Sequence, residues 1–500
     1  MQYAQIIVKN QPAFAAESYT YAIPPELLPA IKVGQLVLVD FHNSRRPGII
    51  IGIKRRVDVD MTSRLKPIKK IITPFSVLFD WQWQLARWLA DYYLAPLAKA
   101  VFAITPPACQ RGNFSTINHH QSPLVTTNHR YYQSPYFIFA PAASRLEKYC
   151  LLVKKSLAAG KQILLLFPNH WRLAEMATAL TEQNQPDFLI CRSQTNKTNQ
   201  LIDWLKIASG EAPIILGLRG AVLAPLANPG AIIVDEPENY AFKEDQAPRF
   251  WLKTVAKKIS QLRGINLIFG DDVPAVEDYG QDGQEPRARP PSQAELARRC
   301  GRARKFAIDN HPVVVTTENR PGTLIAPLIQ SRIKEDSGQS LVYLPLRHQQ
   351  DRDEIKKILG GQAKIIGEKF FHQRNFIIQT SCPDDNILAA LSGRPEMFYQ
   401  TELAERKKRD FPPFSRLIEL KCSPETKEKI TAALPAVKVL GPVSPPASPN
   451  RGESQGGPNP GGQILLKIPL TFSPAKISAV LIPLIKKDYR LAKVNPEPVF

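Results

Sequence analysis

The sequence has 500 residues, is 44% hydrophobic, and carries a formal net charge of +20 with a pI near 9.6. This length predicts three or four domains at roughly 150 residues each, and the excess of basic residues favours nucleic acid as a partner over an anionic membrane. The six scattered cysteines lack any C-x-x-C pair, which argues against a zinc site or a disulfide framework. No apolar run approaches the roughly 18 residues of a membrane span. Residues 1–8 have the pattern of a strand and lack the basic start of a secretion signal, so we expect a cytoplasmic protein.

Residues 1–105 are predicted to form a β-rich first domain. Apolar and polar residues alternate at 6–8, 19–23, 36–41 and 48–53, which is typical of a small barrel or sandwich. A helix is predicted over 80–93, with Asp80 as its N-cap, because its large apolar residues recur at helical spacing. Residues 106–134 are rich in Pro, Asn, His and Ser and are predicted to be a linker.

Residues 135–278 alternate apolar runs with helical patterns, which predicts a parallel α/β sheet. A basic linker is expected over 279–305, and the strands predicted within 306–389 are too few for a second complete α/β unit. The segment 390–500 is expected to be a separate α+β domain, interrupted by a Pro/Gly/Ser-rich loop. The predicted fold class is therefore multidomain α/β.

One apolar run, 231–234, ends abruptly in Asp235 and Glu236. A buried strand with two acids at its end is where a nucleotide-driven motor holds Mg²⁺. Such a motor also needs the phosphate loop G-x-x-x-x-G-K-[ST], and this pattern is absent: Gly160-Lys161 is followed by Gln162.

Several strings of the sequence resemble, in order, the primosomal protein N′ (PriA) family of replication-restart helicases. Three of them, 18–24 (SYTYAIP), 33–41 (VGQLVLVDF) and 88–93 (WLADYY), resemble its N-terminal DNA-binding domain. Others resemble its first helicase lobe and its C-terminal domain; they are 203–206 (DWLK), 217–221 (GLRGA), 234–236 (VDE), 398–399 (FY), 402–406 (ELAER) and 440–442 (LGP).

The resemblance implies a 3′-end-binding domain at 1–105, a P-loop-NTPase-like lobe at 135–278, a truncated second lobe at 306–389 and a C-terminal domain at 390–500. It also exposes departures from the family. Where the phosphate loop would fall, the chain reads FAPAASRL (139–146), with Arg145 in place of the lysine and Leu146 in place of the hydroxyl that binds Mg²⁺. The last helicase motif and the zinc-binding cysteines have no counterpart. We therefore expect no ATP hydrolysis, no bound Mg²⁺ and no zinc, with Arg145, Leu146, Asp235 and Glu236 as relics of the nucleotide site.

The resemblance implies a DNA-end pocket formed by Tyr19, Thr20, His42 and Lys66. An aromatic ring can stack on a base, and a lysine can neutralise a phosphate. Basic residues surround these positions and are expected to contact the DNA backbone; they are Arg45, Arg46, Lys54, Arg55, Arg56, Arg64, Lys69 and Lys70. The alternative is that the tyrosines are strand packing and the lysines are solvated charges.

The function that this pattern indicates is binding of forked or 3′-ended DNA in replication restart and repair, with primosome or replisome proteins as further partners and no membrane. Such a protein is expected to associate with the nucleoid. Two enzymatic alternatives stay open: an active helicase of the same family, and a metal-dependent nuclease that uses Asp235, Glu236, Asp271 and Asp272. A protein scaffold without a DNA role is the third alternative.

Overall fold

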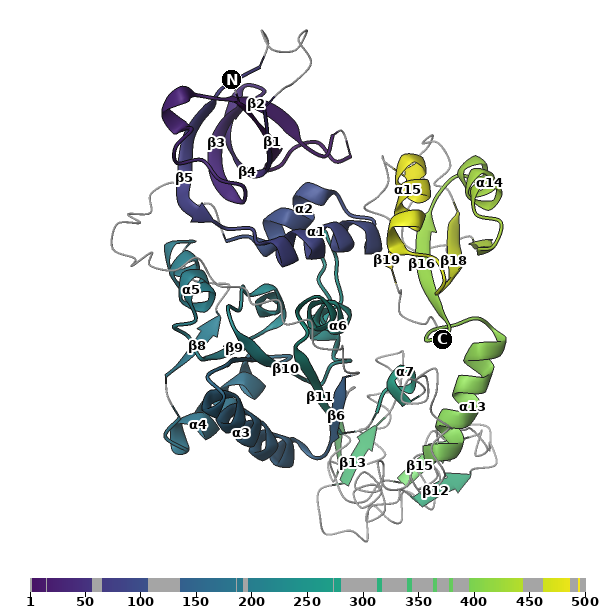
Figure 1. Cartoon of the computed structure of the whole chain (residues 1–500). Helices are drawn as coiled ribbons and strands as arrows, with labels where there is room; N and C mark the ends of the chain where they lie inside the picture. The colour runs from purple at the N-terminus through teal and green to yellow at the C-terminus, as the bar shows by residue number, and fades with distance from the viewer. Residues whose placement is uncertain are drawn as a thin grey trace. The chain divides into compact units, whose positions relative to one another are not determined.

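A computed structural model places the elements of the chain (Figure 1). It describes residues 2–14, 16–55, 65–106, 135–185, 187–191, 197–272, 274–279, 395–443 and 462–485, and the short strands 313–316, 340–343, 363–366, 377–380 and 493–494. The chain divides into two compact units, one formed by 1–272 with 410–500 and one by 273–409. No helix among the described residues is both long enough and apolar enough to cross a membrane.

The N-terminal domain contains a five-stranded antiparallel sheet in the order β2-β1-β4-β3-β5. Its strands are β1 Gln2–Val8, β2 Tyr19–Ile23, β3 Gln35–Phe41, β4 Ser44–Lys54 and β5 Ile68–Ser76. The backbone N–H of Ala22 donates to the carbonyl of Lys66 (3.1 Å), and Ala22 forms a bridge with Pro67. The sheet therefore curls until its two edge strands meet, which is barrel-like. Strand β5 was not predicted, because Pro74 interrupts its pattern.

Two helices, α1 (Asp80–Tyr92) and α2 (Leu97–Ile104), follow the sheet. The prediction of Asp80 as N-cap is wrong, because the cap is Phe79. The backbone N–H of Phe79 donates to the side-chain oxygen of Gln82 (3.1 Å). A glutamine in the first turn therefore provides the hydrogen-bond acceptor for the N–H of the cap residue. Asp80 instead lies inside the first turn, where its charge favours the positive end of the helix dipole.

The α/β lobe holds a six-stranded parallel sheet in the order β6-β11-β10-β7-β9-β8. Its strands are β6 Tyr136–Phe139, β7 Gln162–Leu166, β8 Phe188–Cys191, β9 Ile214–Gly217, β10 Pro229–Asp235 and β11 Asn266–Asp271. Helices α3 (Ala142–Ala158) and α4 (His170–Glu182) pack on one face, and α5 (Lys197–Ser209) and α6 (Leu252–Arg263) pack on the other. The predicted parallel sheet is therefore present, and β8 is an additional strand at its edge.

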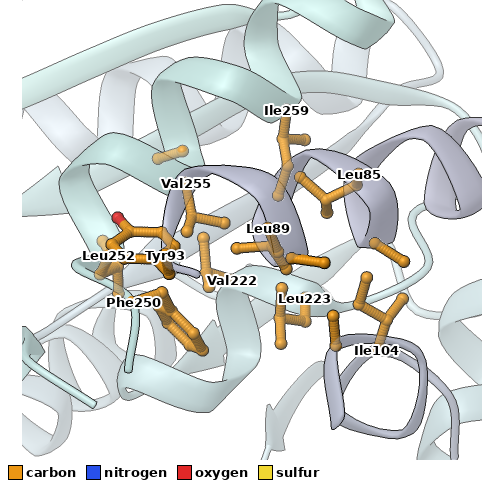
Figure 2. Packing of buried hydrophobic residues seen from close by; sticks show 14 of the residues in the cluster. Leu85, Leu89, Tyr93, Ile104, Val222, Leu223, Phe250, Leu252, Val255 and Ile259 are labelled. Carbon is orange, nitrogen blue, oxygen red and sulfur yellow. The ribbon is translucent and has the colours of Figure 1, made fainter. Parts of the chain in front are cut away.

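Helix α1 of the N-terminal domain packs on α6 and on the short 3-10 helix η4 (Arg219–Leu223) of the lobe. Figure 2 shows Leu85, Leu89 and Tyr93 among the apolar side chains of the lobe. The hydroxyl of Tyr93 accepts a hydrogen bond from the backbone N–H of Trp251 (3.1 Å). Because burial of one leucine stabilises a fold by about 1.5–3 kcal/mol, this shared core holds the domain on the lobe.

The C-terminal domain is a four-stranded antiparallel sheet in the order β17-β18-β16-β19. Its strands are β16 Ser415–Lys421, β17 Lys438–Val443, β18 Gln463–Pro469 and β19 Lys493–Val494, with helices α14 (Pro424–Ala433) and α15 (Pro474–Ile485). Helix α15 contacts α1, where the hydroxyl of Ser478 donates to Asp91 (2.6 Å). Helix α1 thus contacts both the lobe and the C-terminal domain.

The second unit comprises α7 (Val276–Tyr279), α13 (Pro395–Lys408) and two parallel strand pairs. The pairs are β12 (Val313–Thr316) with β15 (Ile377–Thr380), and β13 (Ser340–Tyr343) with β14 (Ala363–Ile366). Tyr279 stacks on Tyr399 at 4.3 Å between ring centroids. Most of the predicted second lobe, of both predicted linkers and of the Pro/Gly/Ser-rich loop lies outside the described residues.

Candidate nucleic-acid interface

The turn between β3 and β4 carries an aromatic group at one end of the N-terminal sheet. His42 has a left-handed backbone (φ 49°), which is uncommon for a residue other than glycine. Its ring lies against Phe41 (centroids 4.5 Å apart), and Phe41 contacts the edge of Tyr19 (4.9 Å). His42 is exposed and Tyr19 is half-buried, so two of these rings can be reached from solvent.

Lys66 reaches the same turn from the start of β5. Its ammonium group donates to the backbone carbonyl of His42 (3.4 Å) while its side chain stays exposed. The structure therefore brings Tyr19, His42 and Lys66 together. Thr20 is not part of this group, because it follows Tyr19 on a strand and points to the other face. The hydroxyl of Thr20 accepts a hydrogen bond from Gln5 (2.8 Å) instead.

The surrounding basic residues differ in how firmly they are held. Arg45 and Lys69 both lie beside Asp40, at 3.7 and 3.2 Å, and remain well exposed. Arg46 is fixed more tightly, since its guanidinium lies over the ring of Phe41 (5.5 Å) and donates to the carbonyl of Asn10 (2.9 Å). Lys70 is exposed, and Arg64 lies outside the described residues.

Two residues of this surface were missed by sequence reasoning. Phe41 joins Tyr19 to His42, and Gln5 fixes Thr20. The end of an apolar strand just before a polar turn was the one signal for Phe41, and the antiparallel register of β1 and β2 was needed to find Gln5.

In the lobe, the segment where the resemblance implies a phosphate loop has no loop. Strand β6 ends at Phe139 and α3 begins at Ala142, so two residues connect them. Arg145 lies in the first turns of α3 and is 1% exposed, while Leu146 packs against the apolar core. A loop that wraps phosphates needs a series of free backbone N–H groups, and two residues cannot supply them.

Arg145 instead forms part of a buried charge cluster around Asp235. One oxygen of Asp235 accepts from Arg145 Nε and from the Tyr149 hydroxyl, both at 2.8 Å. The other accepts from Arg172 Nε (3.2 Å) and Nη2 (2.8 Å). Burial would lower the pKa of Arg145, but Asp235 and Tyr149 raise it above its ordinary value. Both carboxylate oxygens are therefore occupied by protein donors.

The cluster extends to the end of the neighbouring strand β11. The guanidinium of Arg145 also hydrogen-bonds the carbonyl of Ala140 (2.8 Å) and pairs with Asp272. A Cβ atom at Gly270 would lie 1.6 Å from the Tyr149 hydroxyl, so the tyrosine fits only against a glycine. Burial raises the pKa of Asp271 to about 7.

Asp235, Glu236, Asp271 and Asp272 do not form a metal-binding group. Among the described residues, no set of three or more His, Cys, Asp or Glu side chains is arranged to hold a metal ion. The physical reason is that Arg145 is close to three of these acids, Asp235, Glu236 and Asp272, and occupies the space between them.

Comparison with known proteins identifies the N-terminal domain. Residues 5–106 match the family described as the PriA 3′DNA-binding domain (3′BD). The chain is 27% identical over 139 residues to the replication restart protein PriA of Bacillus subtilis, a match that covers 28% of this chain and 17% of that protein. The N-terminal domain thus matches the PriA 3′BD family, and longer segments of the chain are similar to PriA proteins.

Other PriA relatives match longer segments at similar identity. The protein from Haemophilus influenzae is 25% identical over 213 residues, or 41% of this chain and 28% of the relative. The protein from Rickettsia felis is 22% identical over 290 residues, or 55% and 44%. The chain thus spans less than half the length of these PriA relatives, and the 3′BD match contains the aromatic turn and Lys66.

Proposed function

We propose that the protein binds 3′-ended or forked DNA through residues 1–105, and that it acts in replication restart without hydrolysing ATP. The observation that carries the DNA-binding part is the meeting of Tyr19, His42 and Lys66 at one end of a domain that matches the PriA 3′BD. The net charge of +20 agrees with a polyanionic partner.

In this proposal the exposed rings of the turn stack on the terminal base of the strand. Stacking on an aromatic side chain contributes about 1–3 kcal/mol per base. Lys66 neutralises a phosphate of the same strand, and Arg45, Lys69 and Lys70 contact the backbone of the adjacent duplex. Their contacts depend on salt, because each neutralised phosphate releases counterions.

The proposed loss of ATP hydrolysis rests on Asp235. A magnesium ion needs carboxylate oxygens with free lone pairs, and both oxygens of Asp235 already accept two hydrogen bonds. The short β6–α3 connection supports the same proposal, because two residues offer few backbone N–H groups for phosphates. The lobe, the truncated second lobe at 306–389 and the domain at 390–500 are proposed to act as a scaffold, with primosome or replisome proteins as partners.

A binding assay with a fork that carries a recessed 3′ end tests the DNA-binding part. We expect Lys66→Ala to weaken binding and to reduce the salt slope by about one, as the loss of one phosphate contact does. Lys32→Ala is the matched control, because Lys32 is exposed just before β3, whose other end leads into the turn at His42. Equal affinities of the two variants at matched salt would contradict the proposed pocket.

Nucleotide turnover with and without forked DNA tests the second part. We expect no DNA-stimulated hydrolysis of ATP. DNA-stimulated turnover that disappears in Asp235→Asn would overturn the assignment of the lobe as a scaffold and restore the helicase alternative.

A further inference from the structure

Arg416 of the C-terminal domain is a buried cation at the junction with α1. It is 6% exposed, and its guanidinium lies over the ring of Tyr92 at 4.9 Å. Its Nε and Nη2 atoms are buried and hydrogen-bond no group in the part of the chain that the structure describes. Since buried polar atoms are nearly always paired, these two need an explanation.

The two atoms form one edge of the guanidinium, and Arg172 uses the same edge differently. In Arg172, Nε and Nη2 both donate to one carboxylate oxygen of Asp235, at 3.2 and 2.8 Å. This edge is the planar fork with which arginine binds carboxylate or phosphate. The fork of Arg416 therefore has the geometry of an oxyanion site.

The charge around Arg416 also favours an anion over water. Burial lowers the pKa of Arg416, and the neighbours that oppose this shift are the hydroxyls of Tyr92 and Tyr93, not a carboxylate. The nearby Asp91 accepts its hydrogen bond from Ser478. Water could satisfy the two N–H groups but would leave the buried charge uncompensated, which is costly.

Lys467 does not complete this site, although it lies on the strand paired with β16. In the register of the sheet, Arg416 pairs with Ile468 and Leu417 pairs with Lys467. Side chains of successive residues point to opposite faces, so the two cations lie on opposite sides of the sheet. Lys467 lies over the ring of Phe411 at 3.9 Å.

We propose that the Nε–Nη2 edge of Arg416 binds one small oxyanion of the phosphate class between α1 and the C-terminal sheet. The anion neutralises Arg416 and ties β16 to the end of α1. The ligand is a small ion that the folding chain encloses, and a DNA strand is too large to be enclosed at two buried donor atoms. This site is independent of the DNA-binding function proposed for residues 1–105.

The test is thermal unfolding of the full chain against inorganic phosphate, at an ionic strength held constant with chloride. A ligand that binds the folded state raises the midpoint temperature as its concentration rises. We expect a rise in the parent protein and none in Arg416→Met, which keeps the length of the side chain but removes the fork. Lys421→Met, at the exposed end of the same strand, is the matched control and should keep the full rise.

A second variant, Arg416→Lys, keeps the charge and loses the fork, so its phosphate-dependent rise should be smaller than that of the parent protein. It carries the test if the methionine variant does not fold. Titration calorimetry should find one phosphate bound per chain in the parent protein and none in Arg416→Met.

Three results would overturn the proposal. The first is no rise with phosphate in the parent protein, which would mean that water fills the fork. The second is an equal rise in the parent protein and in both Arg416 variants. The third is a rise that depends on Arg416 but is given by an oligonucleotide and not by inorganic phosphate.

Discussion

Asp40 in the N-terminal domain and Asp235 in the lobe each lie beside two cations, yet the two acids are held in different ways. The side chain of Asp40 is 32% exposed, and its partners Arg45 and Lys69 sit at 3.7 and 3.2 Å. Asp235 is fully buried, and Arg145 and Arg172 approach it to 2.8 Å. Loose exposed pairs leave cations free for a ligand, whereas a saturated buried cluster uses its cations to hold the fold.

The contrast between these two acids is tested most directly by a substitution at Asp235. We expect Asp235→Ala to lower the free energy of unfolding of the lobe by about 3–5 kcal/mol, because it leaves two buried arginines without their partner. Chemical denaturation measures this loss. The control is Glu182→Gln at the exposed end of α4, which should change stability by less than about 0.5 kcal/mol. A small loss in Asp235→Ala would mean that the cluster is not a structural core.

The next largest effect is expected at Gly270. Replacement by alanine would place a Cβ atom 1.6 Å from the Tyr149 hydroxyl, so the tyrosine must move away from Asp235. We expect a loss of about 1–3 kcal/mol in unfolding free energy. Gly52→Ala is the control, since a Cβ atom there meets no other atom within 4 Å. Equal stability of the two variants would contradict the tight packing around Tyr149.

The lobe should also respond to pH through Asp271. Its pKa is raised by burial to about 7, above the ordinary value of 3.8. The folded state therefore holds a proton that the unfolded state has lost, and stability falls as pH rises from about 4 to 7. Asp271→Asn should flatten this part of the stability profile, measured by denaturation at a series of pH values. An unchanged slope would assign the pH dependence to another group.

The smallest effect on stability is expected for the loose pair at Asp40. Lys69→Ala should change unfolding free energy by less than about 1 kcal/mol, because exposed ion pairs contribute little. The same variant should reduce the salt slope of fork binding by about one if Lys69 contacts a phosphate. A large stability loss with unchanged DNA binding would reverse the contrast between the two domains.

Much of the fold could be predicted from the sequence, because strands and helices follow from the spacing at which hydrophobic residues recur. Strands β1 to β4, helix α1 and the parallel strands of the lobe all lie in segments with clear patterns. Among the strands of the N-terminal sheet and of the lobe, those missed were β5, where Pro74 breaks the alternation, and β8, which has four residues (FLIC). Neither pattern is long enough to separate a strand from other apolar segments.

The sites were harder to predict. Arg145 was recognised from its place in the chain, but its partners Arg172 and Tyr149 were not, because the fold alone brings them to Asp235. The one signal was an arginine within the apolar pattern of α4, next to Leu173 and before Met176. Of the proposed pocket residues, Thr20 follows Tyr19 on a strand, and the alternation of strand side chains alone could have separated them.

The packing of α1 on the lobe means that the N-terminal domain depends on the lobe to cover its apolar side chains. Leu85, Leu89 and Tyr93 are covered by α6 and η4 (Figure 2). If the lobe were deleted, these three apolar side chains of the N-terminal domain would be exposed to water and would favour aggregation. The lobe thus has a structural role that does not depend on nucleotide turnover, because it covers the apolar side of α1.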